Sequence, residues 1–216
     1  KPAEKYPSAV NAVAALCPEA GLPDGVMSVV HGDKEAVDAL LDNTTVKAIS
    51  FVGSTPIARY VYEKGTANGK RVQALGGAKN HMLVLPDADL DLAADAAVNA
   101  GFGSAGERCM AISVLLAVDS IADDLIAKIS ERMATLKTGD GSMGCDMGPI
   151  VTGVARDRIV GYIEAGVGAG AELVVDGRET EFHGGADGFF VGPTLFDKVS
   201  TDMPDIFPSH ETPKFS

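Results

Sequence analysis

The spacing of apolar residues along this chain changes repeatedly between two patterns. Stretches with the helical period of 3.6 residues are separated by short runs rich in β-branched residues. This alternation predicts an α/β fold in which helices cover a parallel sheet. Helices are expected over 8–16, 34–41, the segment from the turn at 53–56 to about 64, the alanine-rich segment after the turn at 86–89, 121–136 and 154–166. Strands are expected over 26–30, 46–52, 72–75, 82–85, 113–118 and 173–175.

Punctuating residues define the ends of these elements. Ser8 and Asp33 are candidate N-caps of the first two helices. Pro18 is expected to end the first helix, and the glycine-rich segment 139–148 is expected to be a loop.

Composition limits the classes of partner. The 216 residues are 46% hydrophobic, enough to bury one sizeable core or parts of two. The net charge of −12 argues against nucleic acid and against an anionic membrane as partners. No apolar stretch approaches the length that spans a bilayer, and we expect no signal peptide. Three widely spaced cysteines without C-x-x-C spacing predict a reducing compartment, no disulfide framework and no metal site.

One cysteine has the surroundings of a nucleophile. Cys109 follows three spaced glycines and Arg108, and it comes just before the apolar run 113–118. A guanidinium next to a thiol favours the thiolate, which is the form that attacks a carbonyl carbon. Two alternatives stay open, because cysteines are commonly small core residues and because Arg108 could instead pair with Glu107 or another acid.

Two further motifs could hold a dinucleotide. The junction at 51–56 joins a strand to a helix, where unpaired N–H groups, the helix dipole and Gly53 favour a phosphate, with Ser54 as an added donor. Alternatively, Ser54 or Thr55 caps the helix and Pro56 begins it. No G-x-G-x-x-G is present. At the start of the chain, 1–4 offers a cation and a carboxylate that could bracket ribose hydroxyls.

The motifs Lys-Pro-Ala-Glu at 1–4, Phe-Val-Gly-Ser-Thr at 51–55, Leu-Gly-Gly-Ala-Lys-Asn at 75–80 and Gly-Glu-Arg-Cys at 106–109 occur in an order and spacing that resemble the aldehyde dehydrogenase superfamily. Segments 72–81 and 103–111 resemble its CoA-acylating methylmalonate-semialdehyde dehydrogenases, and the likeness covers nearly the whole chain, including 147–150 and 192–196.

The resemblance implies two domains and a set of site residues. Residues 1–77 would be the C-terminal part of a Rossmann-type NAD-binding domain, and 78–216 an α/β catalytic domain truncated at its C-terminal end. The implied roles are nucleophile for Cys109, substrate carboxylate binding for Arg108, adenosine ribose for Lys1 and Glu4, the adenosine site for Lys5, pyrophosphate for Ser54 and nicotinamide for Gly76. An acidic Glu4 favours NAD over NADP, because it would repel a 2′-phosphate.

Ala74 separates two reaction types. Hydrolytic members of the family carry a glutamate two residues before the paired glycines, whereas this chain has Ala74 there, which cannot accept a proton. CoA is therefore the expected acyl acceptor, although Glu107 and His81 stay open as substitute bases. The implied reaction oxidises methylmalonate or malonate semialdehyde to propionyl-CoA or acetyl-CoA with reduction of NAD, as in valine catabolism.

The ends of the chain depart from the family pattern. The asparagine and the second arginine that assist the family's chemistry would precede residue 1, and Asp205 is at best a shortened substitute for a glutamate that holds the nicotinamide ribose. Three hypotheses follow: a truncated CoA-acylating enzyme, a hydrolytic enzyme with another base, and a non-catalytic protein for nucleotide binding or assembly. The parent is expected to be a homo-oligomer, dimeric or tetrameric, in bacterial cytoplasm or the mitochondrial matrix.

Overall fold

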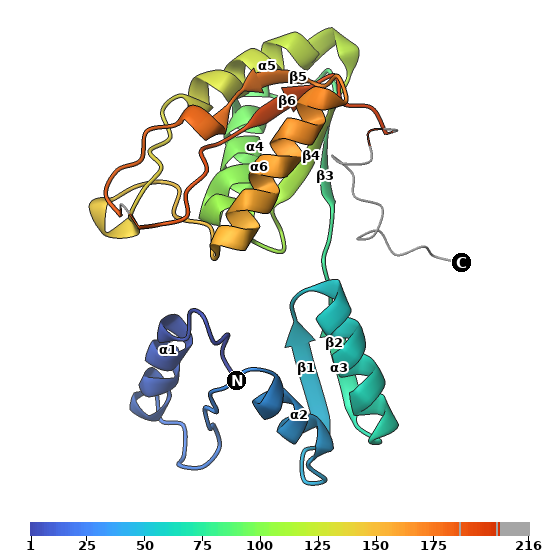
Figure 1. The fold of residues 1–216 in the computed structure, drawn as a ribbon, viewed down its shortest axis with the longest axis vertical. Helices are drawn as coiled ribbons and strands as arrows, with labels where there is room; N and C mark the ends of the chain where they lie inside the picture. Colours follow the sequence, from blue (N-terminus) through green and yellow to red (C-terminus); the bar gives the residue numbers. More distant parts are fainter. Residues whose placement is uncertain (186, 202, 204–216) are drawn as a thin grey trace. The chain divides into compact units, whose positions relative to one another are not determined.

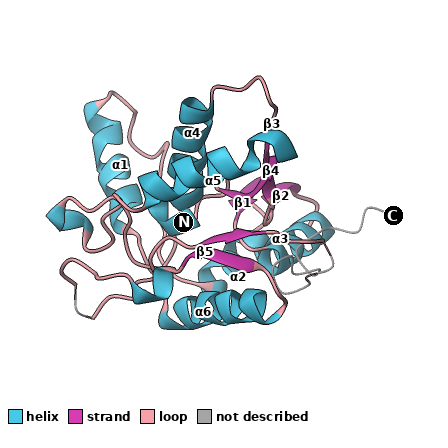
Figure 2. Ribbon diagram, turned by 90° about the horizontal axis from the view of Figure 1, so that it is seen from above, coloured by secondary structure: helices cyan, strands magenta, loops and turns pink. Residues whose placement is uncertain are grey.

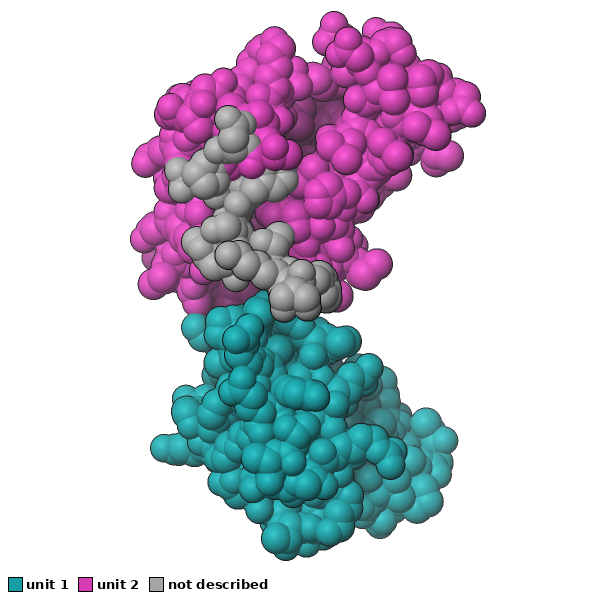
Figure 3. Space-filling model, turned by 90° about the vertical axis from the view of Figure 1, so that its right-hand side faces the viewer, with its two compact units in different colours: residues 1–77 teal, residues 78–216 magenta. Residues whose placement is uncertain are grey.

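The computed structural model describes residues 1–185, 187–201 and 203. The chain divides into two compact units, Lys1–Gly77 and Ala78–Ser216 (Figure 3). The division falls after Gly77, between the same two residues as the boundary expected from the sequence. The functional labels attached to the two domains remain predictions, and each unit is described below by itself.

The first unit contains two parallel strands connected by a helix. Its elements are α1 (Ser8–Glu19), α2 (Lys34–Asp42), β1 (Ala48–Val52), α3 (Thr55–Ala67) and β2 (Arg71–Leu75) (Figure 1). The strands β1 and β2 pair in parallel and α3 connects them, which is the βαβ arrangement that alternating helix and strand patterns favour. Leu41 of α2 and Val61 of α3 are each 1% exposed and form the centre of its small core.

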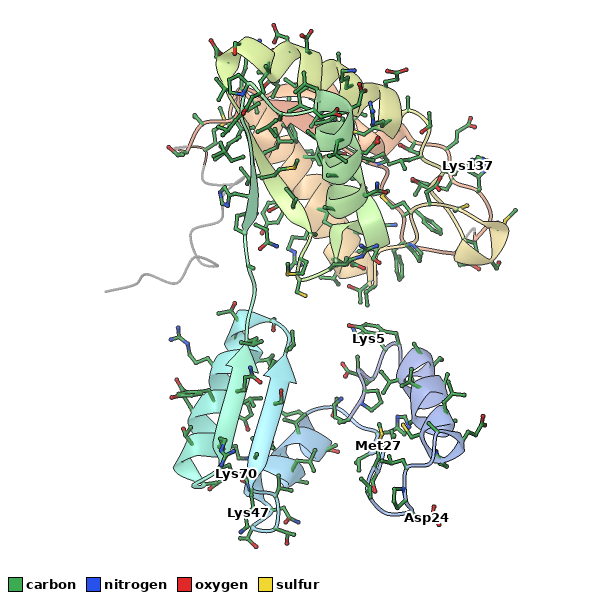
Figure 4. All side chains as sticks on the ribbon, turned by 180° about the vertical axis from the view of Figure 1, so that it is seen from behind. Lys5, Asp24, Met27, Lys47, Lys70 and Lys137 are labelled. Carbon is green, nitrogen blue, oxygen red and sulfur yellow. The ribbon has the colours of Figure 1, made fainter. Side chains whose placement is uncertain are left out.

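A buried lysine ties the beginning of this sheet together. Lys70 precedes β2 and is only 7% exposed (Figure 4). Its ammonium donates hydrogen bonds to the carbonyl oxygens of Asn43 and Val46, at 2.6 and 2.8 Å. These bonds supply partners for a buried cation and fix the turn between α2 and β1.

The N-terminal segment differs from the sequence-based expectation. No strand forms over 26–30, because its apolar side chains find no partner strand within the described part of this unit; Val26 is 66% exposed and Val30 47%. Ser8 is the first residue of α1 rather than its cap, and α1 continues through Pro18 to Glu19. Asp33 does occupy the N-cap of α2, but its side chain makes no capping hydrogen bond.

The second unit is larger and contains two short sheets. The strands β3 (Asn80–Val84) and β4 (Ile112–Ala117) pair in parallel, whereas β5 (Glu172–Val175) and β6 (Leu195–Asp197) pair antiparallel. The helices are α4 (Leu90–Phe102), α5 (Asp119–Met133) and α6 (Gly153–Gly168), with short 3₁₀ turns η1 (Gly103–Gly106), η2 (Gly141–Met143) and η3 (Gly177–Glu179). Asp89 caps α4 by accepting hydrogen bonds from the backbone N–H groups of Asp91 and Leu92.

Two hydrophobic clusters lie in this unit. The larger one joins α4 and α5 to the β3–β4 sheet, and the smaller one lies under α6 (Figure 2). Neighbouring residues of β6 contact different clusters, since Leu195 packs against the larger and Phe196 against the smaller. The buried members of the two clusters are Val84, Ala93, Ala94, Val98, Leu125, Ile129 and Met133 in the larger, and Ile150, Ile163 and Val191 in the smaller.

The α/β class is confirmed, and the purely parallel sheet is confirmed only in part. The expected strands 46–52, 72–75, 82–85 and 113–118 correspond to the parallel pairs. The antiparallel β6 was not expected, because three residues after a Gly-Pro-Thr segment carry too little alternation to predict a strand. In the described residues, no helix is long and apolar enough to cross a membrane.

Candidate functional site

The loop before Cys109 has an unusual backbone. Helix α4 ends at Phe102, and three consecutive residues then adopt left-handed conformations, with φ of 52° at Ser104, 54° at Ala105 and 72° at Gly106. Non-glycine residues in this region cost about 1 kcal/mol or more each. Such strain persists only where the surroundings impose it, and it is typical of loops whose backbone path matters for function.

The amide of Asn80 holds the cysteine segment in place. Its Nδ2 donates to the carbonyl oxygens of Cys109 and Ala111, each at 2.9 Å. The N–H of Ala111 donates in turn to the carbonyl of Arg108 at 3.0 Å, which closes a tight turn around the cysteine. The β3–β4 register shifts between Asn80 and His81, so that Asn80 opposes Ile112 at the start of β4.

Asn80 was part of a sequence motif but received no role from sequence reasoning. An asparagine at the first residue of a strand indicates a turn or a cap equally well, and nothing local connects it to a loop 29 residues away. Only the pairing of β3 with β4 brings the two together.

The thiol of Cys109 is free and exposed, and so is the guanidinium beside it. Nε of Arg108 donates to Oγ of Ser104 at 3.3 Å. The guanidinium lies against Gly103, where a Cβ would be 2.5 Å from Nη2 of Arg108 and would displace that side chain. Among the described residues no carboxylate pairs with Arg108. The guanidinium therefore keeps donors for an external anion.

Glu107 binds the backbone of a different loop and not Arg108. Its Oε1 accepts a hydrogen bond from the backbone N–H of Val151 at 3.3 Å. The alternative in which Glu107 pairs with Arg108 is therefore wrong. His81 is exposed, and its Nδ1 donates to the carbonyl of Lys79 at 2.8 Å. Ala74 lies within β2, opposite Phe51 of β1. Whether Glu107 or His81 acts as a base in place of a residue at position 74 stays a prediction.

In the first unit, the carboxyl ends of β1 and β2 lie side by side, because Val52 pairs with Leu75 in register. The segment after β2 returns to the start of α3, where Oγ1 of Thr55 accepts a hydrogen bond from the N–H of Gly77 at 3.0 Å. Gly76 passes so close that a Cβ there would lie 2.9 Å from the same oxygen. Gly76 and the N-terminus of α3 are thus brought together at the edge where α/β sheets bind ligands.

Ser54 is the N-cap of α3, and its carbonyl accepts the N–H of Ala58 at 2.9 Å. Its hydroxyl makes no capping hydrogen bond, and the hydroxyl of Thr55 accepts the N–H of Gly77 instead. Ser54 thus occupies the N-cap and Pro56 the first turn, as the alternative predicted, although neither hydroxyl makes a capping hydrogen bond. The exposed Ser54 hydroxyl and the positive end of the helix dipole remain available to an anion.

Lys1 and Glu4 form an ion pair, while their role at a ribose stays a prediction. Nζ of Lys1 lies 3.3 Å from Oε2 of Glu4 and 2.5 Å from the carbonyl oxygen of Gly32. Hydrogen bonding from its own backbone N–H, and then from Lys1, holds the pKa of the Glu4 carboxyl below its usual value of 4.5. Lys5 is exposed in the segment before α1 (Figure 4).

The remaining site predictions stay predictions. Asp205 lies outside the described residues. Within the described ranges, no group of three or more His, Cys, Asp or Glu residues could hold a metal ion. Arg108 and Cys109 are adjacent in the second unit, while Lys1, Glu4, Lys5, Ser54 and Gly76 all belong to the first.

The family model described as "Aldehyde dehydrogenase family" matches residues 1–207. The chain belongs to the aldehyde dehydrogenase family. Its α/β fold is accordingly an aldehyde dehydrogenase fold. A malonate-semialdehyde dehydrogenase of Pseudomonas aeruginosa is 59% identical over 205 residues, which are 94% of this chain and 41% of that protein. This chain therefore spans less than half the length of that aldehyde dehydrogenase.

Solved structures of aldehyde dehydrogenases are similar to this chain in both sequence and fold. A methylmalonate-semialdehyde dehydrogenase from Oceanimonas doudoroffii is 53% identical with a TM-score of 0.89, covering 95% of this chain and 42% of its own. A Sinorhizobium meliloti 1021 protein assigned to the same enzyme and complexed with NAD is 51% identical with a TM-score of 0.88, covering 95% of this chain and 43% of its own.

Proposed function

We propose that this chain supplies the cofactor-binding and thiol-bearing parts of an NAD-dependent, CoA-acylating malonate- or methylmalonate-semialdehyde dehydrogenase. The observation that carries the proposal is the exposed Cys109, held by Asn80 next to an unpaired Arg108, in a chain 59% identical to a malonate-semialdehyde dehydrogenase. We propose residues 1–77 as part of its NAD-binding domain and 78–216 as part of its catalytic domain. The whole protein is proposed to be a homo-oligomer.

The residues of the first unit fit a dinucleotide. The Ser54 hydroxyl and the start of α3 offer donors for a pyrophosphate, and Gly76 gives a close approach that a side chain would block. Lys1 and Glu4 would bind the adenosine ribose, with Lys5 flanking the adenosine site. A relative of known structure is complexed with NAD. When bound, NAD⁺ supplies the hydride acceptor of the oxidation.

In the second unit, Cys109 would begin the chemistry. Its thiolate adds to the aldehyde carbon and forms a carbon–sulfur bond, and the resulting thiohemiacetal becomes a thioester when the carbon loses its hydride. Asn80 has a positioning role, because it binds the carbonyl oxygens of Cys109 and of Ala111, two residues further along the chain.

Arg108 would bind the carboxylate of the substrate. A guanidinium forms paired hydrogen bonds with a carboxylate, and within the described chain this one has no acidic partner to displace. With Ala74 in β2 there is no carboxylate at that position to activate water, so the thiol of CoA is the proposed acyl acceptor. The acyl group passes to the CoA sulfur, Cys109 leaves as thiolate, and the CoA thiol gives up its proton. The β-carboxylate then leaves as CO₂, and the carbanion left behind takes up that proton, which gives acetyl-CoA or propionyl-CoA.

The test follows NADH by absorbance and acyl-CoA by mass spectrometry, with malonate semialdehyde as substrate and with or without CoA. The proposal expects both products only when CoA is present, and neither from Cys109→Ala. Cys145→Ala is the matched control, since Cys145 is half-buried in the loop 144–146 and has no assigned role. The longer Pseudomonas aeruginosa relative serves as the reference enzyme.

Other outcomes lead to different conclusions. Equal NADH formation without CoA, with free acid as product, would identify a hydrolytic enzyme and reject the acylating reaction. NAD binding by calorimetry without turnover would support a non-catalytic role for this chain. Unchanged turnover in Cys109→Ala would reject the nucleophile.

A further inference from the structure

A cavity of about 440 Å³ lies within the second unit. Its walls come from α6, from the segment 191–194 before β6 and from the end of α4. Neither Cys109 nor Arg108 lines it, and the proposed reaction gives it no role. A volume of this size is in the range of small-molecule sites.

The charge of this cavity is opposite to that of the chain. The protein has 30 acidic and 18 basic residues, yet the lining includes Lys79 and Arg158 and no acidic residue among those described. In the described structure, neither cation has an ion pair or donates a side-chain hydrogen bond, although Lys79 is half-buried. An acidic protein that leaves two cations unpaired in one cavity provides a local site for an anion.

The rest of the lining is largely apolar. Phe102, Ile159 and Ile163 contribute hydrocarbon, and Ile163 belongs to the small buried cluster under α6. Ser113 and Tyr162 also line the cavity, and their hydroxyls have no partner among the described residues. Apolar walls with a few unpaired polar groups are the usual composition of a site for an amphipathic small molecule.

We propose that this cavity binds a small organic anion with an apolar body. Lys79 and Arg158 bind its carboxylate or phosphate group, and the apolar wall of α6 and Phe102 contacts its hydrocarbon. Ala105, one of the left-handed residues of the cysteine loop, lines the same cavity, so the ligand would contact the base of that loop.

The experiment is isothermal titration calorimetry on the full 216-residue chain with four probes: hexanoate, hexyl phosphate, hexanol and inorganic phosphate. Saturable 1:1 binding of hexanoate or hexyl phosphate is expected, and comparison of the two identifies the preferred acid group. Hexanol and inorganic phosphate should each bind at least about tenfold more weakly, because each lacks one half of the interaction.

Variants locate the site. Arg158→Gln and Lys79→Met should each weaken anion binding about tenfold, the size expected for a lost charged hydrogen bond. Arg156→Gln is the control on the same helix, because Arg156 is paired with Asp157 and does not line the cavity. Cys109→Ala should bind normally, which separates this site from the proposed reaction.

Four results would overturn the proposal. They are no binding of either anion, hexanol binding as tightly as the anions, unchanged affinity in both cavity variants, and equal loss in Arg156→Gln or Cys109→Ala. Circular dichroism of each variant confirms that it is folded.

Discussion

The start of α3 in the first unit and the cysteine loop in the second both leave polar groups available to a ligand, but their backbones are held in different ways. At α3 the order is regular: a parallel strand pair ends, a helix begins, and one hydrogen bond from Gly77 to Thr55 fixes the approach. At the cysteine loop, two non-glycine residues are in left-handed conformations and a distant amide holds the chain. The backbone at the start of α3 is held by the ends of regular strands and a helix, whereas the backbone of the cysteine loop is held by a few individual contacts.

The first prediction concerns the thiol, where the largest effect is expected. If the proposed function holds, Cys109→Ala should lower turnover with malonate semialdehyde and CoA by at least about 10⁴-fold, the scale seen when a nucleophile is removed. Cys145→Ala should retain activity. Comparable losses in both variants would show that Cys109 is not the nucleophile.

The second prediction tests the contact that holds the loop. Asn80→Ala removes both hydrogen bonds to the carbonyls of Cys109 and Ala111, so it should lower the free energy of unfolding by about 1–2 kcal/mol. Urea denaturation measures the change. His81→Ala, one residue along the strand and exposed, should change it by less than about 0.5 kcal/mol. Equal effects would mean that the loop does not depend on this amide.

The third prediction tests the regular region. Gly76→Ala would place a methyl group 2.9 Å from Oγ1 of Thr55 and displace its hydrogen bond from Gly77, at a cost of about 1 kcal/mol. Thermal unfolding and NAD titration would report it. Gly161→Ala is the control, because nothing lies within 4 Å of that position in α6, and there alanine should stabilise by about 0.5–1 kcal/mol. A neutral Gly76→Ala would show that the close approach is unnecessary.

The smallest effect is expected at Glu4. Because its pKa is lowered in the folded chain, its contribution to stability is present above the unfolded value of about 4.5 and is lost as the pH falls through the folded value. Lys1→Met should raise the Glu4 midpoint in a carbon-detected NMR titration, without fully restoring the usual value, since the backbone hydrogen bond remains. Lys5→Met, which removes a weaker influence, should raise it less. The reverse order would contradict the pairing of Lys1 with Glu4.

Sequence predicted the regular region better than the irregular one. The strand 46–52 and the helix starting after 53–56 are observed as β1 and α3, because their signals lie within the segment itself. Apolar periodicity failed over 26–30, where a strand needs a partner that the described residues do not provide. The helix expected over 121–136 is α5 at Asp119–Met133, and its last expected residues form tighter turns.

At the cysteine loop, the residue types were evident and the geometry was not. Adjacency alone placed Arg108 beside Cys109, but the choice of Ser104 rather than Glu107 as partner depends on how the loop folds. The left-handed conformation of Ala105 has no signal in sequence, since alanine normally avoids it. The bond from Asn80 depends on strand pairing across 29 residues, which no local pattern encodes.

The register shift between Asn80 and His81 has a consequence for the energetics of reaction. By placing an amide between the carbonyls of Cys109 and Ala111, it orders the backbone at Cys109, the proposed nucleophile, during folding rather than at the encounter with substrate. The conformational entropy of that segment is then lost before any ligand arrives, so binding energy is not consumed in organising it. Asn80, at the irregular start of β3, thereby preorganises the segment 109–111.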